Sequence, residues 1–131
     1  MASKHAAKQS KRFENYTEAE RAELTCKWQE RVRTGNFSVG VTGAGEIRVF
    51  GRAGDAPVAY PRITSLAVLE TLSEEERYAI QLADRVTAEH ARMSRPLYAV
   101  PRGNAFGGEM ISKFDPTRDE DILVLNQIRG G

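Results

Sequence analysis

Hydrophobic and polar residues alternate most regularly between positions 37 and 52 of the chain. A period of two is typical of a strand that buries one of its faces. Pairing Val41 with Ile47 keeps the apolar residues on one face and leaves residues 43–45 as a three-residue turn. The pattern therefore predicts a β-hairpin at about 37–52. Its inward set consists of Phe37, Val39, Val41, Ile47 and Val49.

A first helix is predicted at about 18–32. Thr17 and Glu20 have the spacing of a capping box, in which a hydroxyl and a carboxylate satisfy the first free amides of a helix. Gly35 then supplies a residue type at which helices commonly end. The helical period directs these side chains toward the core: Ala22 or Leu24, Cys26 or Trp28, and Val32.

A second, longer helix is predicted at about 74–93. Ser73 and Glu76 repeat the capping-box spacing, and the three glutamates at 74–76 suit the positive end of the helix dipole. Apolar residues then recur at intervals of three and four, so one face of this helix should be buried. Its core stripe consists of Ala79, Leu82, Ala83 and Val86.

The rest of the chain has weaker signals. Residues 58–60 and 96–100 suit short extended segments, and a short helix is predicted at about 65–70. Residues 122–125 favour a strand that joins the hairpin, because a hairpin alone is only marginally stable. The Asp-Pro pair at 115–116 leaves a helix start as the alternative for this last stretch.

Together these elements predict one α+β domain. A chain of 131 residues is in the usual size range of a single domain, and a 40% share of hydrophobic residues is ordinary for a folded protein. We expect a small, mainly antiparallel sheet built on the hairpin, with the 18–32 and 74–93 helices packed on one face. Residues 1–12 have no apolar period and are predicted to form a flexible basic arm ahead of the domain at 13–131.

The net charge of +1 hides an uneven distribution of cations. The arm carries Lys4, Lys8, Lys11 and Arg12 without any acidic residue, so the remainder of the chain is mildly acidic. Total charge therefore favours neither a general nucleic-acid binder nor a mimic of nucleic acid. Any binding driven by cations must be local to the arm or to a small surface.

The sequence contains no recognisable catalytic or metal-binding motif among its two histidines and one cysteine. His90 fits the edge of the second helix near its C-terminus, and Cys26 fits a reduced structural thiol. The acidic residues from Asp115 to Asp121 suit a solvated turn better than a cation site. We therefore expect a protein without catalytic activity, cofactor or metal.

The outward face of the hairpin is the candidate binding surface. If Ile47 and Val49 face the core, the residues between and beyond them face solvent. An aromatic ring flanked by guanidinium groups can stack an unpaired base while the cations meet its phosphates, and it can equally anchor in an acidic protein. With the arm, the candidate site consists of Lys4, Lys8, Lys11, Arg12, Arg48, Phe50 and Arg52.

These features favour a small nucleic-acid-associated accessory factor, with nucleic acid as its expected partner and a single strand as one form of it. A protein-interaction module, such as an inhibitor, an adaptor or a subunit of a larger assembly, is the alternative. An enzyme with an anion-binding glycine loop at 103–108 beside Arg102 comes third. No apolar run is long enough to cross a bilayer, and the start of the chain has no hydrophobic signal core, so we expect a cytoplasmic protein with no membrane partner.

Overall fold

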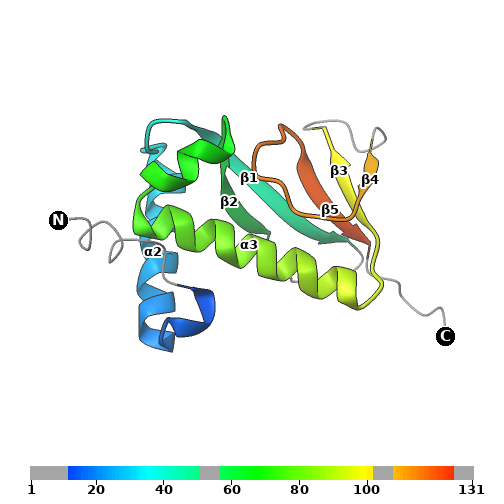
Figure 1. The fold of residues 1–131 in the computed structure, drawn as a ribbon, viewed down its shortest axis with the longest axis horizontal. Helices are drawn as coiled ribbons and strands as arrows, with labels where there is room; N and C mark the ends of the chain where they lie inside the picture. Colours follow the sequence, from blue (N-terminus) through cyan, green and yellow to red (C-terminus); the bar gives the residue numbers. More distant parts are fainter. Residues whose placement is uncertain (1–11, 51–56, 102–107, 126–131) are drawn as a thin grey trace.

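Five strands form one mixed sheet in the computed structural model, which describes residues 12–50, 57–101 and 108–125. The order across the sheet is β2-β1-β5-β3-β4 (Figure 1). β1 and β5 run parallel, and the other neighbouring pairs are antiparallel. The predicted α+β class and the largely antiparallel sheet are confirmed. The strands are β1 (Val41–Phe50), β2 (Val58–Ile63), β3 (Leu97–Val100), β4 (Glu109–Ile111) and β5 (Asp121–Leu125).

Within the described residues, two α-helices accompany the sheet. α3 (Glu74–Arg92) crosses one face of it, and α2 (Glu18–Thr34) packs against α3 near the β2 edge (Figure 1). Two short 3-10 helices, η1 (Phe13–Asn15) and η2 (Leu66–Thr71), precede α2 and α3. The predicted helices at about 18–32 and 74–93 are therefore confirmed to within two residues at each end.

Both α-helices begin at the predicted capping boxes. The Thr17 hydroxyl accepts from the Glu20 amide at 3.1 Å, and the Glu20 carboxylate accepts from the Thr17 amide at 2.8 Å. Ser73 and Glu76 make the same reciprocal pair at the start of α3. α2 ends at Gly35, whose φ of 71° is in the left-handed region that favours glycine. Local chemistry thus sets these helix boundaries.

The core lies between the sheet and α3. Its central cluster consists of Ile47, Tyr60, Ala83, Leu97, Ile122 and Val124. From α2, Leu24 and Trp28 are buried, and the Trp28 indole donates to the Ala59 carbonyl at 2.9 Å. Of the predicted alternatives Cys26 or Trp28 it is Trp28 that faces inward and Cys26 that is exposed, and Val32, which was expected to face inward, is exposed as well. α2 therefore buries a narrower stripe than its sequence suggested, because it packs beside the sheet rather than across it.

The predicted turn at 43–45 is wrong. Residues 41–50 form one continuous strand, and β1 pairs with β2 instead of folding back on itself, so that Ile47 lies opposite Val58. Phe37 and Val39 precede this strand rather than belonging to it. The glycines that resembled a turn have another use, since Gly45 lies opposite Tyr60 and the tyrosine ring lies directly over it.

Replacing Gly45 with alanine should therefore destabilise the fold. An added Cβ would lie 2.5 Å from Cζ of Tyr60, which is closer than packed atoms approach. We expect a loss of about 2 kcal/mol in the free energy of unfolding, measured by urea denaturation, as for other overpacked cores. The cost should shrink in a Tyr60→Leu background, where the ring is gone; equal costs in both backgrounds would contradict this explanation.

The C-terminal strand is confirmed, but its position in the sheet was not predictable. β5 lies between β1 and β3, at the centre of the sheet. The alternative of a helix starting at 115–116 is not formed: the chain makes only a local turn there, in which the Asp115 carboxylate accepts from the amide and hydroxyl of Thr117. The segment between β4 and β5 crosses the core face, where Phe114 packs edge-on against Tyr60 at 4.8 Å between ring centroids.

Candidate functional site

The structure describes part of the sequence-predicted site. Arg48 lies on β1 and is exposed, and Arg12 is exposed just before η1. Phe50 is the last residue of β1, and its side chain is not described. The remaining predicted residues lie outside the described residues: Lys4, Lys8, Lys11 and Arg52.

Arg48 faces away from the core, as the alternation along β1 predicted. Its neighbour Ile47 is 1% exposed, whereas the Arg48 side chain is 62% exposed. The guanidinium donates from Nε and Nη2 to one carboxylate oxygen of Glu46, at 2.9 and 2.6 Å. Such exposed ion pairs contribute between zero and about 1 kcal/mol, so a phosphate or another carboxylate could replace Glu46 at little cost.

Arg48 is the first member of a row of four side chains that crosses the sheet, here called the outer row. Arg48 on β1 lies opposite Leu123 on β5, Leu123 lies opposite Tyr98 on β3, and Tyr98 lies opposite Met110 on β4. The chain neighbours of Leu123 and Tyr98 are buried on the α3 side. Since successive side chains on a strand point to opposite faces, the outer row lies on the face away from α3.

The outer row is accessible. Met110 is 64% exposed, Tyr98 and Leu123 are partly exposed, and no helix of the described chain packs on this face. A phenol ring thus lies in the same row as a guanidinium, with an aliphatic side chain on each side of the ring. The sequence predicted an extended segment here but did not single out Tyr98, because its place in one row with Arg48 depends on a strand order that no local pattern records.

Arg12 and Arg48 lie on opposite sides of the sheet. Arg12 lines a surface pocket of about 350 Å³ on α3, which packs on the inner face. Beside it the Phe13 ring stacks on Tyr78 and is contacted by Arg21 and Arg85, whose Cζ atoms are 4.2 and 4.8 Å from its centroid. The pocket is lined by Arg12, Phe13, Glu14, Gln81, Asp84 and Arg85. The two halves of the predicted site are therefore not brought together by described residues.

The acidic residues near the C-terminus are compensated by arginines. Arg118 pairs with Glu109 and Glu120 at 2.9 and 3.0 Å, and Arg62 pairs with Asp121 at 2.6 Å. Among the residues that the structure describes, no three histidine, cysteine or acidic side chains are arranged to hold a metal ion. The glycine loop of the enzyme hypothesis lies largely outside the described residues.

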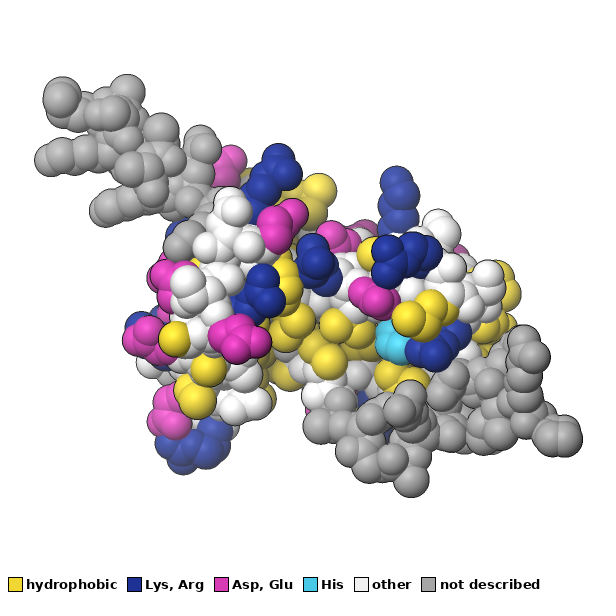
Figure 2. All heavy atoms as spheres, turned by 90° about the horizontal axis from the view of Figure 1, so that it is seen from below, with side chains coloured by type: hydrophobic (Ala, Val, Ile, Leu, Met, Phe, Trp, Pro, Cys, Tyr) yellow, Lys and Arg dark blue, Asp and Glu magenta, His cyan; other side chains and the backbone are white. Residues whose placement is uncertain are grey.

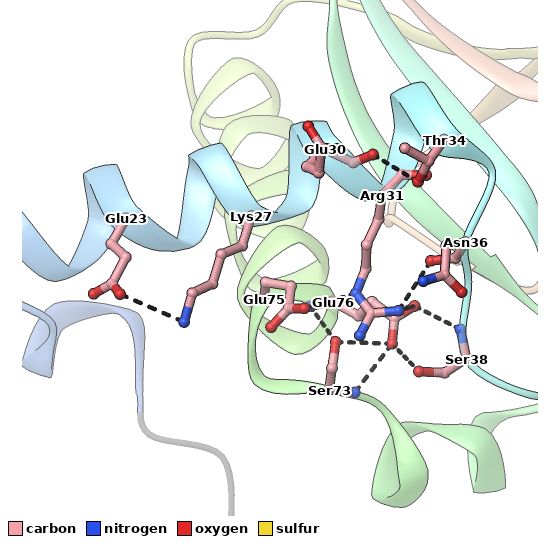
Figure 3. A network of polar contacts seen from close by, with 10 residues as sticks. All are labelled: Glu23, Lys27, Glu30, Arg31, Thr34, Asn36, Ser38, Ser73, Glu75 and Glu76. Carbon is pink, nitrogen blue, oxygen red and sulfur yellow. Dashed lines mark hydrogen bonds and ion pairs between the residues drawn. The ribbon is translucent and has the colours of Figure 1, made fainter.

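A second constellation, not predicted from sequence, surrounds the fully buried carboxylate of Glu76 (Figure 3). The Ser73 amide and hydroxyl donate to it at 3.0 and 2.9 Å. From the segment before β1, the Ser38 amide donates at 3.0 Å and the Ser38 hydroxyl donates as well. A capping-box glutamate therefore also joins the start of α3 to a distant loop.

These hydrogen bonds keep the Glu76 carboxylate ionised. Burial alone would raise the pKa of Glu76, but the donors from Ser38 and Ser73 favour the charged form and together hold the pKa below its ordinary value. Arg31 on α2 adds a cation 3.7 Å away, while its Nε donates to Glu75 at 2.6 Å. The site is a pre-organised anion pocket that the protein fills with its own carboxylate.

Stability should consequently fall in acid. Because the pKa of Glu76 is lower in the folded than in the unfolded chain, its contribution is present above the unfolded pKa and is lost as pH falls through the folded one. We expect the free energy of unfolding to decrease between about pH 5 and pH 2. In Glu76→Gln the decrease should be smaller, and an unchanged pH slope in that variant would contradict the assignment.

Charges of both signs are interspersed on the underside of the molecule, and no continuous basic patch is visible among the described residues of this face (Figure 2). Within the described ranges, neither α-helix is both long and apolar enough to span a bilayer. No protein-family model, curated protein or solved structure matches this chain at a significant level. Function must therefore be argued from the site itself.

Proposed function

We propose that this protein is a non-enzymatic, nucleic-acid-associated accessory factor that holds a single strand against the outer row. The observation that carries the proposal is that Tyr98 and Arg48 lie in one accessible row on an open sheet face, two strands apart with Leu123 between them. An open sheet with an accessible ring offers a stacking platform for an unpaired base, and a nearby guanidinium offers a phosphate contact. A duplex hides its base faces, so a single strand is the expected ligand.

The charge distribution indicates that the arm contributes the electrostatic attraction to nucleic acid. Six of the nineteen basic residues, but only one of the eighteen acidic residues, lie outside the described residues, which leaves the described part with a net charge of −4. Electrostatic attraction of a polyanion must therefore come mainly from segments such as the arm. Eleven residues precede Arg12 and can span at most about 40 Å when extended, which is enough to pass around the edge of a small domain.

Fluorescence anisotropy tests the proposal. A labelled oligothymidylate of about 15 nucleotides and a duplex of the same length would be titrated at about 50 and 200 mM salt. We expect the single strand to bind more tightly, and Lys4→Gln/Lys8→Gln/Lys11→Gln to reduce the slope of log affinity against log salt by about 2. Binding without salt dependence, a preference for duplex, or an unchanged slope in the triple variant would overturn the proposal.

A protein-interaction module is the second candidate, favoured by the three apolar members of the outer row and the acidic described surface. Arginine and aromatic side chains are enriched in protein interfaces, so the same row could contact a protein. A complete lack of oligonucleotide binding, together with self-association or a stable protein complex in light scattering, would decide for this candidate.

In either case we place the protein in the cytoplasm, where the exposed thiol of Cys26 would stay reduced.

A further inference from the structure

The Glu46 carboxylate binds the guanidinium of Arg48 on the outer face of the sheet. Glu46 and Arg48 are two positions apart on β1, so both side chains lie on the face opposite the buried Ile47. The Arg48 Nε and Nη2 both donate to the same oxygen of Glu46, at 2.9 and 2.6 Å. The carboxylate thus engages two adjacent donors of the kind that a guanidinium uses to hold a phosphate in a bidentate manner.

The Glu46–Arg48 pair lies at the surface and makes few other polar contacts. Within the part of the chain that the structure describes, Arg48 is the only cation that pairs with Glu46. The Glu46 amide donates to Asp121 at 3.1 Å, and that second carboxylate is compensated by Arg62 at 2.6 Å. The Glu46 side chain is 34% exposed and the Arg48 side chain 62%. A ligand can therefore separate the pair without disturbing the core.

Glu46 opposes the binding of a phosphate at Arg48 in either of two geometries. A phosphate that takes the Nε side of the guanidinium must displace the carboxylate from both donors. A phosphate that takes the opposite end leaves two anions close together around one cation, and these anions repel each other. Because an exposed ion pair adds little to the stability of a fold, the main consequence of this pair concerns ligand binding.

We propose that Glu46 competes with the phosphates of a single strand for Arg48 and thereby limits the affinity of the outer row. This inference rests on the proposed function, because the ligand that Glu46 acts against is the phosphodiester backbone of that strand. Proteins commonly set their selectivity and affinity by placing an unfavourable charge beside a favourable contact. Removing the charge of Glu46 should consequently strengthen oligonucleotide binding, whereas truncating Arg48 weakens it.

A gain of affinity in the anisotropy titration tests this inference. At about 200 mM salt, where charges more than about 7 Å apart are largely screened, Glu46→Gln should bind oligothymidylate about 3- to 5-fold more tightly than wild type. The unfolding midpoint should stay unchanged, because the lost pair is exposed. Glu30→Gln is the matched control, since it removes the same charge from an exposed pair with Arg33 on α2. This control should bind within about 1.5-fold of wild type.

The Arg48→Ala background shows whether the gain acts through Arg48. Without the guanidinium there is nothing to compete for, so adding Glu46→Gln should change the affinity by less than about 1.5-fold. A gain of the same size in this background would overturn the inference, as would equal affinities of Glu46→Gln and Glu30→Gln. Either result, with oligothymidylate still bound by wild type, contradicts this inference alone. An absence of binding in wild type and in Glu46→Gln would overturn both the proposed function and this inference.

Discussion

Replacing Glu76 with alanine is expected to lower the free energy of unfolding by about 3 kcal/mol. The substitution would leave the amides and hydroxyls of Ser38 and Ser73 without their acceptor in a buried site. It would also remove the carboxylate that faces Arg31 and half of the capping box of α3. Because one substitution removes several interactions at once, the loss in the free energy of unfolding should exceed that of a typical polar substitution.

Urea denaturation monitored by circular dichroism measures this effect, and Glu75→Ala provides the matched control. Glu75 is the adjacent glutamate of the same helix, but its side chain is 16% exposed and its described partner is Arg31. We expect Glu75→Ala to cost about 1 kcal/mol, well below the cost of Glu76→Ala. Equal losses for the two variants would show that the buried network is not a special feature of the fold.

Truncating Tyr98 should have the largest effect on binding. Removal of one stacking ring weakens single-strand binding by roughly 10- to 100-fold, so Tyr98→Ala should lose affinity of this order in the anisotropy titration. Tyr98→Phe retains the ring and should bind within about 3-fold of wild type. If the Tyr98 hydroxyl rather than the ring contacted the oligonucleotide, both variants would bind more weakly. Phe37→Ala, which removes a partly exposed ring that packs against Trp28, is the control and should bind normally.

Substituting Arg48 tests whether a positive charge in the outer row contributes to oligonucleotide binding. Arg48→Ala and Arg33→Ala remove exposed arginines that each pair with a nearby glutamate, so their effects on stability should be equally small. Oligonucleotide affinity should fall in Arg48→Ala and stay unchanged in Arg33→Ala. Equal affinities for the two variants would remove Arg48 from the proposed surface.

Elements whose signals are local were predictable from the sequence. Thr17 and Ser73 mark helix starts because capping hydrogen bonds join residues only three positions apart. The alternation around Ile47 correctly predicted which face of β1 is buried. The glycines at 43 and 45 were misinterpreted because a glycine needed beneath a ring looks the same in sequence as a glycine needed in a turn.

Features that depend on strand order could not be predicted. Tyr98 and Arg48 are 50 positions apart and share a row only because β5 inserts between β1 and β3. Likewise, the link from Glu76 to Ser38 depends on where the segment before β1 lies relative to α3. Long-range pairing of this kind is decided by the packing of the whole domain, which no local pattern records.

A titration of methyl-labelled methionine followed by NMR tests single-strand binding at the outer row most directly. The sequence contains three methionines, of which Met110 lies in the outer row and Met93 lies at the end of α3. These two have similar exposure, 64% and 51%, so each reports on its own surface under matched conditions. On addition of oligothymidylate, binding at the outer row should shift the Met110 methyl resonance and leave the Met93 resonance in place. An unmoved Met110 resonance at saturating oligonucleotide would contradict it.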